Sequence, residues 1–220
     1  MGIKRIIVLS ISFMLILSGC APTYVPTTVN TPLLTYKGEL QAAVYAGTSG
    51  FDPQVAYALT DNIGLMLNGS FKDTKSDSSE NFHKHNFIEL GVGYYLRFVG
   101  KGRFGIYGGY GIGDLQARSS SSIFNNTSDV KLNRIFIQPE IGLVTDLIDL
   151  SYAMRIVIVG VNQDPLKYTR SFLEPAVTIR IGYKHVKFMS QIGYSVPFNA
   201  TNLIDHQPFM FSIGLHTRLN

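Results

Sequence analysis

The sequence has little charge, a single cysteine and only one long apolar run. Charged residues make up 15% of its 220 residues, whereas hydrophobic residues make up 45%. With Cys20 alone, no disulfide can form within the chain. The formal charge of +4 is too small and too scattered to indicate binding of nucleic acid. A phosphate-binding loop is also absent, since the glycine-rich run IYGGYGIGDL leads into no helix.

The apolar run lies at the N-terminus and predicts an export signal. Lys4 and Arg5 precede apolar residues over 6–17, a stretch shorter than the about 20 residues of a membrane-spanning helix. The following LSGC resembles the lipobox of bacterial lipoproteins, which implies cleavage before Cys20 and its acylation. We therefore expect a signal peptide over 1–19 and a mature chain that begins with a lipidated, palmitate-bearing cysteine. Two or three acyl chains would anchor it firmly.

The segment after the cysteine contains three prolines and has no hydrophobic periodicity. This composition predicts a flexible tether over 20–35. The remaining residues, 36–220, are expected to form one domain.

Apolar residues alternate with polar or small residues through most of this domain. Ile88, Leu90 and Val92 fall on one face of a strand, and Glu89 and Gly91 fall on the other. The segments with this pattern are 37–47, 51–59, 63–71, 84–98, 103–117, 132–144, 149–160, 172–183, 186–196 and 207–219. The alternation predicts an all-β, antiparallel transmembrane β-barrel of ten strands. Eight strands are the alternative count, and a soluble β-sandwich is the competing fold.

The links between these segments predict an orientation. Short links over 60–62, 99–102, 145–148 and 184–185 alternate with long links over 72–83, 118–131, 161–171 and 197–206. The first link, around 47–50, is short although it should be long. Outer-membrane barrels have short periplasmic turns and longer outer loops. Both barrel termini are therefore expected to face the periplasm, with the lipid on Cys20 in the inner leaflet of the outer membrane.

The predicted inward face collects acids and bases in nearly equal number. Buried charges must be paired and hydrogen-bonded, so we expect a network of ion pairs in a narrow, largely filled lumen. Its predicted members are Glu39, Asp52, Glu89, Arg97, Arg134, Glu140, Arg155, Glu174, Arg180, Lys187 and Arg218.

The histidines give no strong indication of a catalytic or metal site. His83 and His85 are two residues apart and could share one face, but the polar run over 72–81 before them favours a solvated loop. His185, His206 and His216 do not stand beside a serine and an acid in the sequence. We expect no metal, no cofactor and no catalytic residue.

The stretches KGELQAAVYAGTSGFDPQVAYALTDNIGLMLNGSF and FMFSIGLHTRLN are similar to small OmpA-like and OmpX-like outer-membrane barrels, particularly the barrel lipoproteins of Bacteroidota-type genomes. The resemblance implies a non-enzymatic structural or interaction protein. A lipid anchor is redundant for attaching a barrel to the membrane, which favours an accessory subunit of a machine for outer-membrane protein assembly or secretion. The expected partners are membrane lipid and other outer-membrane proteins. The alternatives are a narrow channel for small solutes and, third, a lipid-modifying enzyme or protease with a site at the barrel rim.

Overall fold

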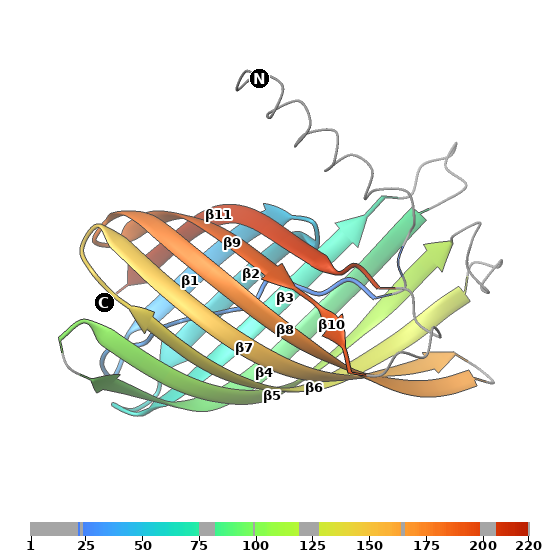
Figure 1. Ribbon diagram of the computed structural model, residues 1–220, viewed down its shortest axis with the longest axis horizontal. Coiled ribbons are helices and arrows are strands. Elements are labelled where there is room, and N and C mark those ends of the chain that lie inside the picture. Colours follow the sequence, from blue (N-terminus) through green and yellow to red (C-terminus); the bar gives the residue numbers. More distant parts are fainter. Residues whose placement is uncertain are drawn as a thin grey trace, which may run out of the picture.

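A computed structural model of the protein describes residues 22, 24–74, 82–98, 100–118, 128–163, 166–198 and 206–219. They form one antiparallel sheet that closes into a barrel, because β1 pairs with both β2 and β11 (Figure 1). The strands are β1 (Leu40–Gly47), β2 (Gly50–Ala58), β3 (Ile63–Asp73), β4 (Phe82–Phe98), β5 (Gly102–Arg118), β6 (Ser128–Leu143), β7 (Ile148–Gln163), β8 (Leu166–Tyr183), β9 (Val186–Tyr194), β10 (Val196–Pro197) and β11 (Phe209–Leu219). The predicted signal peptide over 1–19 and Cys20 lie outside the described residues.

The short strand β10 continues β9 and takes no separate place in the wall. Both strands pair with β8, and the register is the same on either side of Ser195: Gly193 lies opposite Ala176, and Val196 lies opposite Leu173. The eleven labelled strands therefore make a wall of ten. This confirms the predicted all-β barrel and the count of ten.

The wall has an apolar outer face, as its alternation predicts. Ile88, Leu90 and Val92 of β4 are 55%, 62% and 54% exposed, whereas Glu89 between them is 1% exposed. Exposed aromatic residues lie toward both ends of the strands, namely Tyr57, Tyr94, Tyr183 and Phe188 at one end and Phe51, Phe71, Tyr194 and Phe198 at the other. An apolar band with aromatic residues at both edges is the surface of a membrane-spanning barrel and excludes the soluble sandwich.

Among the described residues, no helix is long and apolar enough to cross a membrane.

One end of the barrel has only short links, over 59–62, 99–101, 144–147 and 184–185, and is called the short-turn end below. Leu40 and Leu219, which pair with each other, also lie there, and Figure 1 places it at the left. The opposite, long-loop end carries links over 74–81, 119–127 and 198–208, together with two short links over 48–49 and 164–165.

The predicted loop over 161–171 is wrong, because β7 and β8 continue through most of it. In this part of the wall the pattern of the two faces is reversed. Val159 and Val161 are buried inside, whereas Asn162 and Lys167 are exposed outside. The strands project here beyond the apolar band, so polar residues face outward and the lipid-type alternation is lost.

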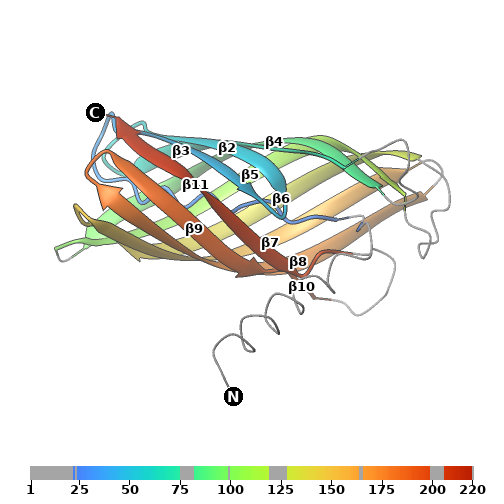
Figure 2. The ribbon, with the colours of Figure 1, turned by 90° about the horizontal axis from the view of Figure 1, so that it is seen from above.

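The predicted tether is also wrong over 24–35, a segment called the plug below. Every residue over 24–34 is buried. The plug runs lengthwise inside the barrel, and Figures 1 and 2 show it as the blue trace between the walls. Its two prolines, Pro26 and Pro32, mark an extended chain without regular hydrogen bonds, and that chain is held by the barrel interior.

We predict that Leu90→Arg lowers the free energy of unfolding by about 2–4 kcal/mol, because it places a charge near the middle of the lipid-facing band. Urea unfolding in lipid vesicles measures the change. Leu90→Met, which stays apolar, is the matched control and should lower the value by less than about 1.5 kcal/mol. Equal stability of the two variants would show that this face lies in water.

Candidate functional site: the plugged lumen

Three glutamines of the wall bind the backbone of the plug. Gln191 accepts from the Val29 amide at 2.7 Å and donates to the Val29 carbonyl at 2.8 Å. Gln54 donates to the Thr28 carbonyl at 2.7 Å, and Gln138 donates to the Asn30 carbonyl at 2.6 Å. A buried peptide group without a partner costs about 1–3 kcal/mol. These side chains therefore take the place that a neighbouring strand has in a sheet.

Acidic side chains of the wall accept from the plug's amides along its length. Asp52 accepts from the Thr28 amide at 2.9 Å. Glu140 accepts from the Leu33 amide at 3.3 Å. At the short-turn end, Glu39 accepts from the Thr35 amide at 2.7 Å. Plug and wall thus bind each other from near the middle of the lumen to its short-turn end.

Arg180 shows that the plug also satisfies the wall. Its side chain is buried and donates from Nη2 to the carbonyl and the hydroxyl of Thr31. Within the described part of the chain, no carboxylate lies within ion-pair distance of Arg180. Removing the plug would leave this buried cation without those two acceptors, which is costly in a low-dielectric interior.

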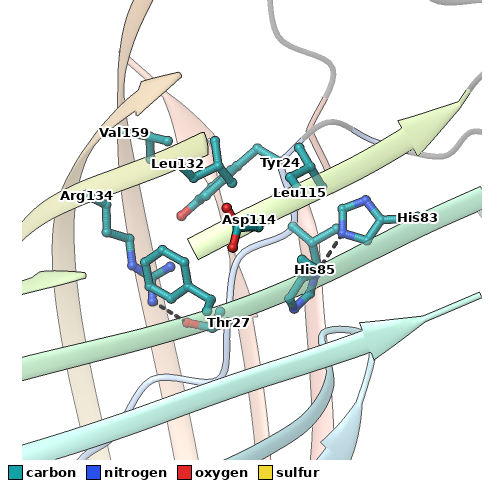
Figure 3. A pocket seen from close by; sticks show the side chains of 11 residues that line it. Tyr24, Thr27, His83, His85, Asp114, Leu115, Leu132, Arg134 and Val159 are labelled. Atoms are coloured by element: carbon teal, nitrogen blue, oxygen red, sulfur yellow. Dashed lines mark hydrogen bonds between the residues drawn. The ribbon is translucent and has the colours of Figure 1, made fainter. Parts of the chain in front are cut away.

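A cluster around Glu89 joins four strands, β3, β4, β6 and β7, at mid-height. Glu89 forms ion pairs with Arg134, at 2.6 Å from Nε, and with Arg155. Asn68 donates to the same carboxylate at 2.9 Å. Arg134 also donates to the Thr27 hydroxyl of the plug at 2.7 Å (Figure 3). The two guanidinium groups lie 4.2 Å from the ring centroids of Phe87 and Phe136, respectively.

Two further ion pairs lie toward the short-turn end. Lys187 contacts Asp149 at 2.7 Å, and Arg218 contacts Glu39 at 2.7 Å. Glu174 lies nearer the long-loop end, where it accepts from the Tyr24 hydroxyl at 2.8 Å. The lumen therefore holds several separate polar groups, which the plug connects.

The structure places most of the predicted network residues inside the barrel. Buried there are Glu39, Asp52, Glu89, Arg134, Glu140, Arg155, Glu174, Arg180 and Lys187, while Arg218 is partly buried. Arg97 differs: it is exposed at the short-turn end of β4, where the wall no longer covers it. Asp149, Arg103 and Arg170 are buried and were missed. Asp149 stands between the exposed Ile148 and Leu150, so strict alternation would have identified it.

Apolar side chains of the plug pack where the wall leaves room. A Cβ added to Gly142 would lie 2.6 Å from Leu33, and one added to Gly64 would lie 2.6 Å from Leu34. Leu33 has a φ of 49°, a left-handed conformation that costs about 1–2 kcal/mol outside glycine. Burial of its side chain offsets a cost of this size. The glycines of the wall thus accommodate the part of the plug nearest the short-turn end.

Among the described residues, two small cavities lie beside the plug. A cavity of about 20 Å³ lies next to Tyr24, His83 and Arg134 (Figure 3). A second cavity of about 10 Å³ lies near Arg180 and His216. About 10–15 Å³ on this measure holds one water molecule. These cavities therefore have room for single waters and not for a solute.

A hydrogen-bonded chain of a serine and two histidines lies beside the cavity next to Tyr24. Ser70 Oγ is 2.9 Å from His85 Nε2, and His85 Nδ1 is 2.8 Å from His83 Nε2. His83 Nδ1 is 2.7 Å from the Pro22 carbonyl. Because a carbonyl only accepts, His83 Nδ1 carries a proton. The other bonds then run from His85 Nδ1 to His83 Nε2 and from Ser70 Oγ to His85 Nε2.

This arrangement corrects the prediction of a solvated loop at His83 and His85, since both are buried. Sequence spacing could not reveal the serine. Ser70 belongs to β3, which pairs with β4. In that register His85 lies opposite Lys72, and Ser70 is the next residue of β3 that faces the same side of the sheet as Lys72. In the described residues, no three side chains of His, Cys, Asp or Glu are grouped to hold a metal ion.

Comparisons with known proteins add little. No family model and no curated protein matches the chain. A solved structure of a loop L8 deletion mutant of OmpT, an outer membrane protein of Vibrio cholerae, is 10% identical with a TM-score of 0.35; the match covers 77% of this chain and 53% of that one. The translocator domain of the autotransporter NalP from Neisseria meningitidis is 11% identical with a TM-score of 0.46, covering 82% and 86%. The chain thus spans about half the length of the OmpT variant.

We predict that Glu89→Gln lowers the free energy of unfolding by about 3–5 kcal/mol, because it leaves two buried guanidinium groups without a counter-charge. Asp73→Asn is the matched control. It removes the carboxylate from an exposed ion pair with Lys84 and should cost no more than about 1 kcal/mol. Both are measured by chemical denaturation of the folded barrel in lipid vesicles. A loss at Glu89 as small as that at Asp73 would contradict a buried ion-pair cluster around Glu89.

Proposed function

We propose that the protein is a non-conducting lipoprotein of the outer membrane with a structural or interaction role, whose lumen is closed by its own N-terminal segment. The observation that carries this proposal is the plug, which is buried over 24–34 and bonded to the wall along its length. A solute path would require displacing it and exposing the charges that it helps to satisfy. The proposal therefore places the contacts of the protein with partners on its outer surface and at its two ends.

The lipid anchor predicted at Cys20 supports an interaction role. A closed barrel already holds the chain in the membrane, so an added acyl anchor must serve another purpose. Fixing the end of the chain beside a partner is such a purpose, which fits an accessory subunit of an outer-membrane assembly or secretion machine. A narrow solute channel is the competing function, and conductance separates the two.

We expect the full chain to give no steady single-channel current in planar lipid bilayers, because the plug fills its lumen. A chain lacking 24–35 should give discrete conductance steps. If that chain does not fold, the combined variant Gln54→Ala, Gln138→Ala and Gln191→Ala weakens the plug while keeping it. This variant should open intermittently.

Two results would contradict this proposal. Steady current through the full chain, equal to that of the truncated chain, would favour the channel. A folded truncated chain that stays silent would show that the plug is not what closes the lumen.

A second candidate function, ester hydrolysis at the barrel rim, is favoured by one specific observation, the chain from Ser70 through His85 to His83. A serine bonded to a histidine that is oriented by a third group is the arrangement of an activated nucleophile. Ser70 Oγ would attack an ester carbonyl while His85 Nε2 accepts its proton and passes it to the leaving alkoxide. Water would then release the acyl group. Ser70 is 1% exposed, so the plug would have to move first.

Labelling with a fluorophosphonate tests this candidate. The test uses the variant in which the three plug-binding glutamines are replaced by alanine, so that the plug is weakened. There Ser70 should react about 100-fold faster than in the same variant that also carries His85→Phe, because removal of a general base typically causes a loss of this size. Ser151, a buried lumen serine that contacts Thr31 of the plug, is the internal control. Equal labelling of Ser70 and Ser151 would mean that the two histidines have only a structural role.

A further inference from the structure

We infer that the N-terminal segment is threaded through the barrel from the short-turn end to the long-loop end, so that the chain before Tyr24 emerges at the outer face of the membrane. This inference rests on the proposed function for the closed lumen and adds a direction to it. It also names the contact of that end, which is the outer leaflet of the bilayer. The two ends of the plug carry the argument.

The upper end of the plug is fixed among residues at the long-loop end. The Tyr24 ring stacks on Phe172 with 4.6 Å between the ring centroids. Tyr24 forms an isolated parallel bridge with His206, which precedes β11. The Pro22 carbonyl is 2.7 Å from Nδ1 of His83, the second residue of β4. Because β4 and β11 both begin at the long-loop end, residues 22 and 24 lie there.

The surroundings of Tyr24 fit a position beyond the membrane. Tyr24 belongs to the main apolar core, which also includes Leu115, Val130, Val159 and Val161. These side chains come from the parts of β5, β6 and β7 that lie nearest the long-loop end. Here apolar residues face inward and polar ones outward, so this part of the barrel is built like a water-soluble protein.

The lower end of the plug is fixed at the short-turn end. The Thr35 amide is bonded to Glu39, which directly precedes β1. The Arg103 side chain at the start of β5 donates to the Thr35 hydroxyl at 3.2 Å. The plug therefore spans the barrel lengthwise.

Chain length then limits where an anchor can sit. Only Ala21 separates Pro22 from Cys20. An extended chain advances at most about 3.6 Å per residue, so these two Cα atoms, two steps apart, can be only about 7 Å from each other. The apolar band of an outer-membrane barrel is about 25 Å tall. A lipid on Cys20 could not reach the opposite leaflet. With long loops facing outward, the anchor belongs in the outer leaflet, not in the inner leaflet that the sequence alone led us to expect.

Epitope accessibility in intact cells tests the direction of threading. One epitope is inserted between Ala21 and Pro22, a second follows Asn220, and a third lies between β5 and β6 as the reference for the outer face. We expect antibody to bind the first and third epitopes in intact cells, and the second only after the envelope is permeabilised. The matched control is the chain lacking 24–35, whose N-terminal epitope would lie at the short-turn end. Its signal in intact cells should fall to that of the C-terminal epitope.

The inference is overturned if the epitope at Ala21 stays hidden in intact cells while the one between β5 and β6 is bound. It is also overturned if the control chain keeps its N-terminal epitope at the surface. Conductance separates these failures from failure of the closed-barrel proposal. A hidden epitope on a silent barrel refutes the threading alone, whereas an exposed epitope on a conducting barrel refutes the closure alone.

Discussion

The structure depends on one constraint: polar groups buried inside the barrel need hydrogen-bond partners. The wall turns charged and amide side chains inward because its outer face must be apolar. An extended segment inside the lumen adds peptide groups that have no neighbouring strand. Each set would be costly alone. Together they supply one another with hydrogen-bond partners, as when Gln191 binds both polar groups of Val29 and Arg180 donates to Thr31. Pro26 and Pro32 reduce the demand, since neither has an amide N–H to satisfy.

Along the barrel axis, each part of the plug has side chains that suit the part of the wall it contacts. At the long-loop end, the apolar ring of Tyr24 packs into the core formed by the projecting strands. At mid-height, the polar segment 27–31 meets the glutamines and the charged cluster. At the short-turn end, Leu33 and Leu34 fit beside Gly142 and Gly64. A shift of the plug by one residue would bring apolar side chains to the charges and leave amides unpaired, so this match fixes its register.

The strands could be predicted from sequence because lipid imposes a strict period of two on the wall. That rule failed where lipid ends. At β7 and β8, polar residues face outward beyond the apolar band, and their pattern led to the prediction of a loop. At the end of β4, alternation assigns Arg97 to the inner face, although its side chain is exposed. The plug could not be predicted by any local rule. Its prolines and its lack of periodicity are equally typical of a tether. Contacts with residues far away in the sequence, such as Gln138 and Gln191, distinguish the two. The pairing of Ser70 with His85 was missed for the same reason, since it depends on strand register.

Closure of the lumen and the exit of the N-terminal chain follow from the same connection. A loop folded inward from the rim would close a barrel and leave both chain ends at the short-turn end. Here the segment that closes the barrel is continuous with β1, and only 36–39 separate the two. Its lower end is therefore held at the short-turn end, and a chain that fills the lumen from there must leave by the other mouth. The residues that hold the plug, Gln191 and Arg180 among them, thereby also determine at which end of the barrel Pro22 and Tyr24 lie.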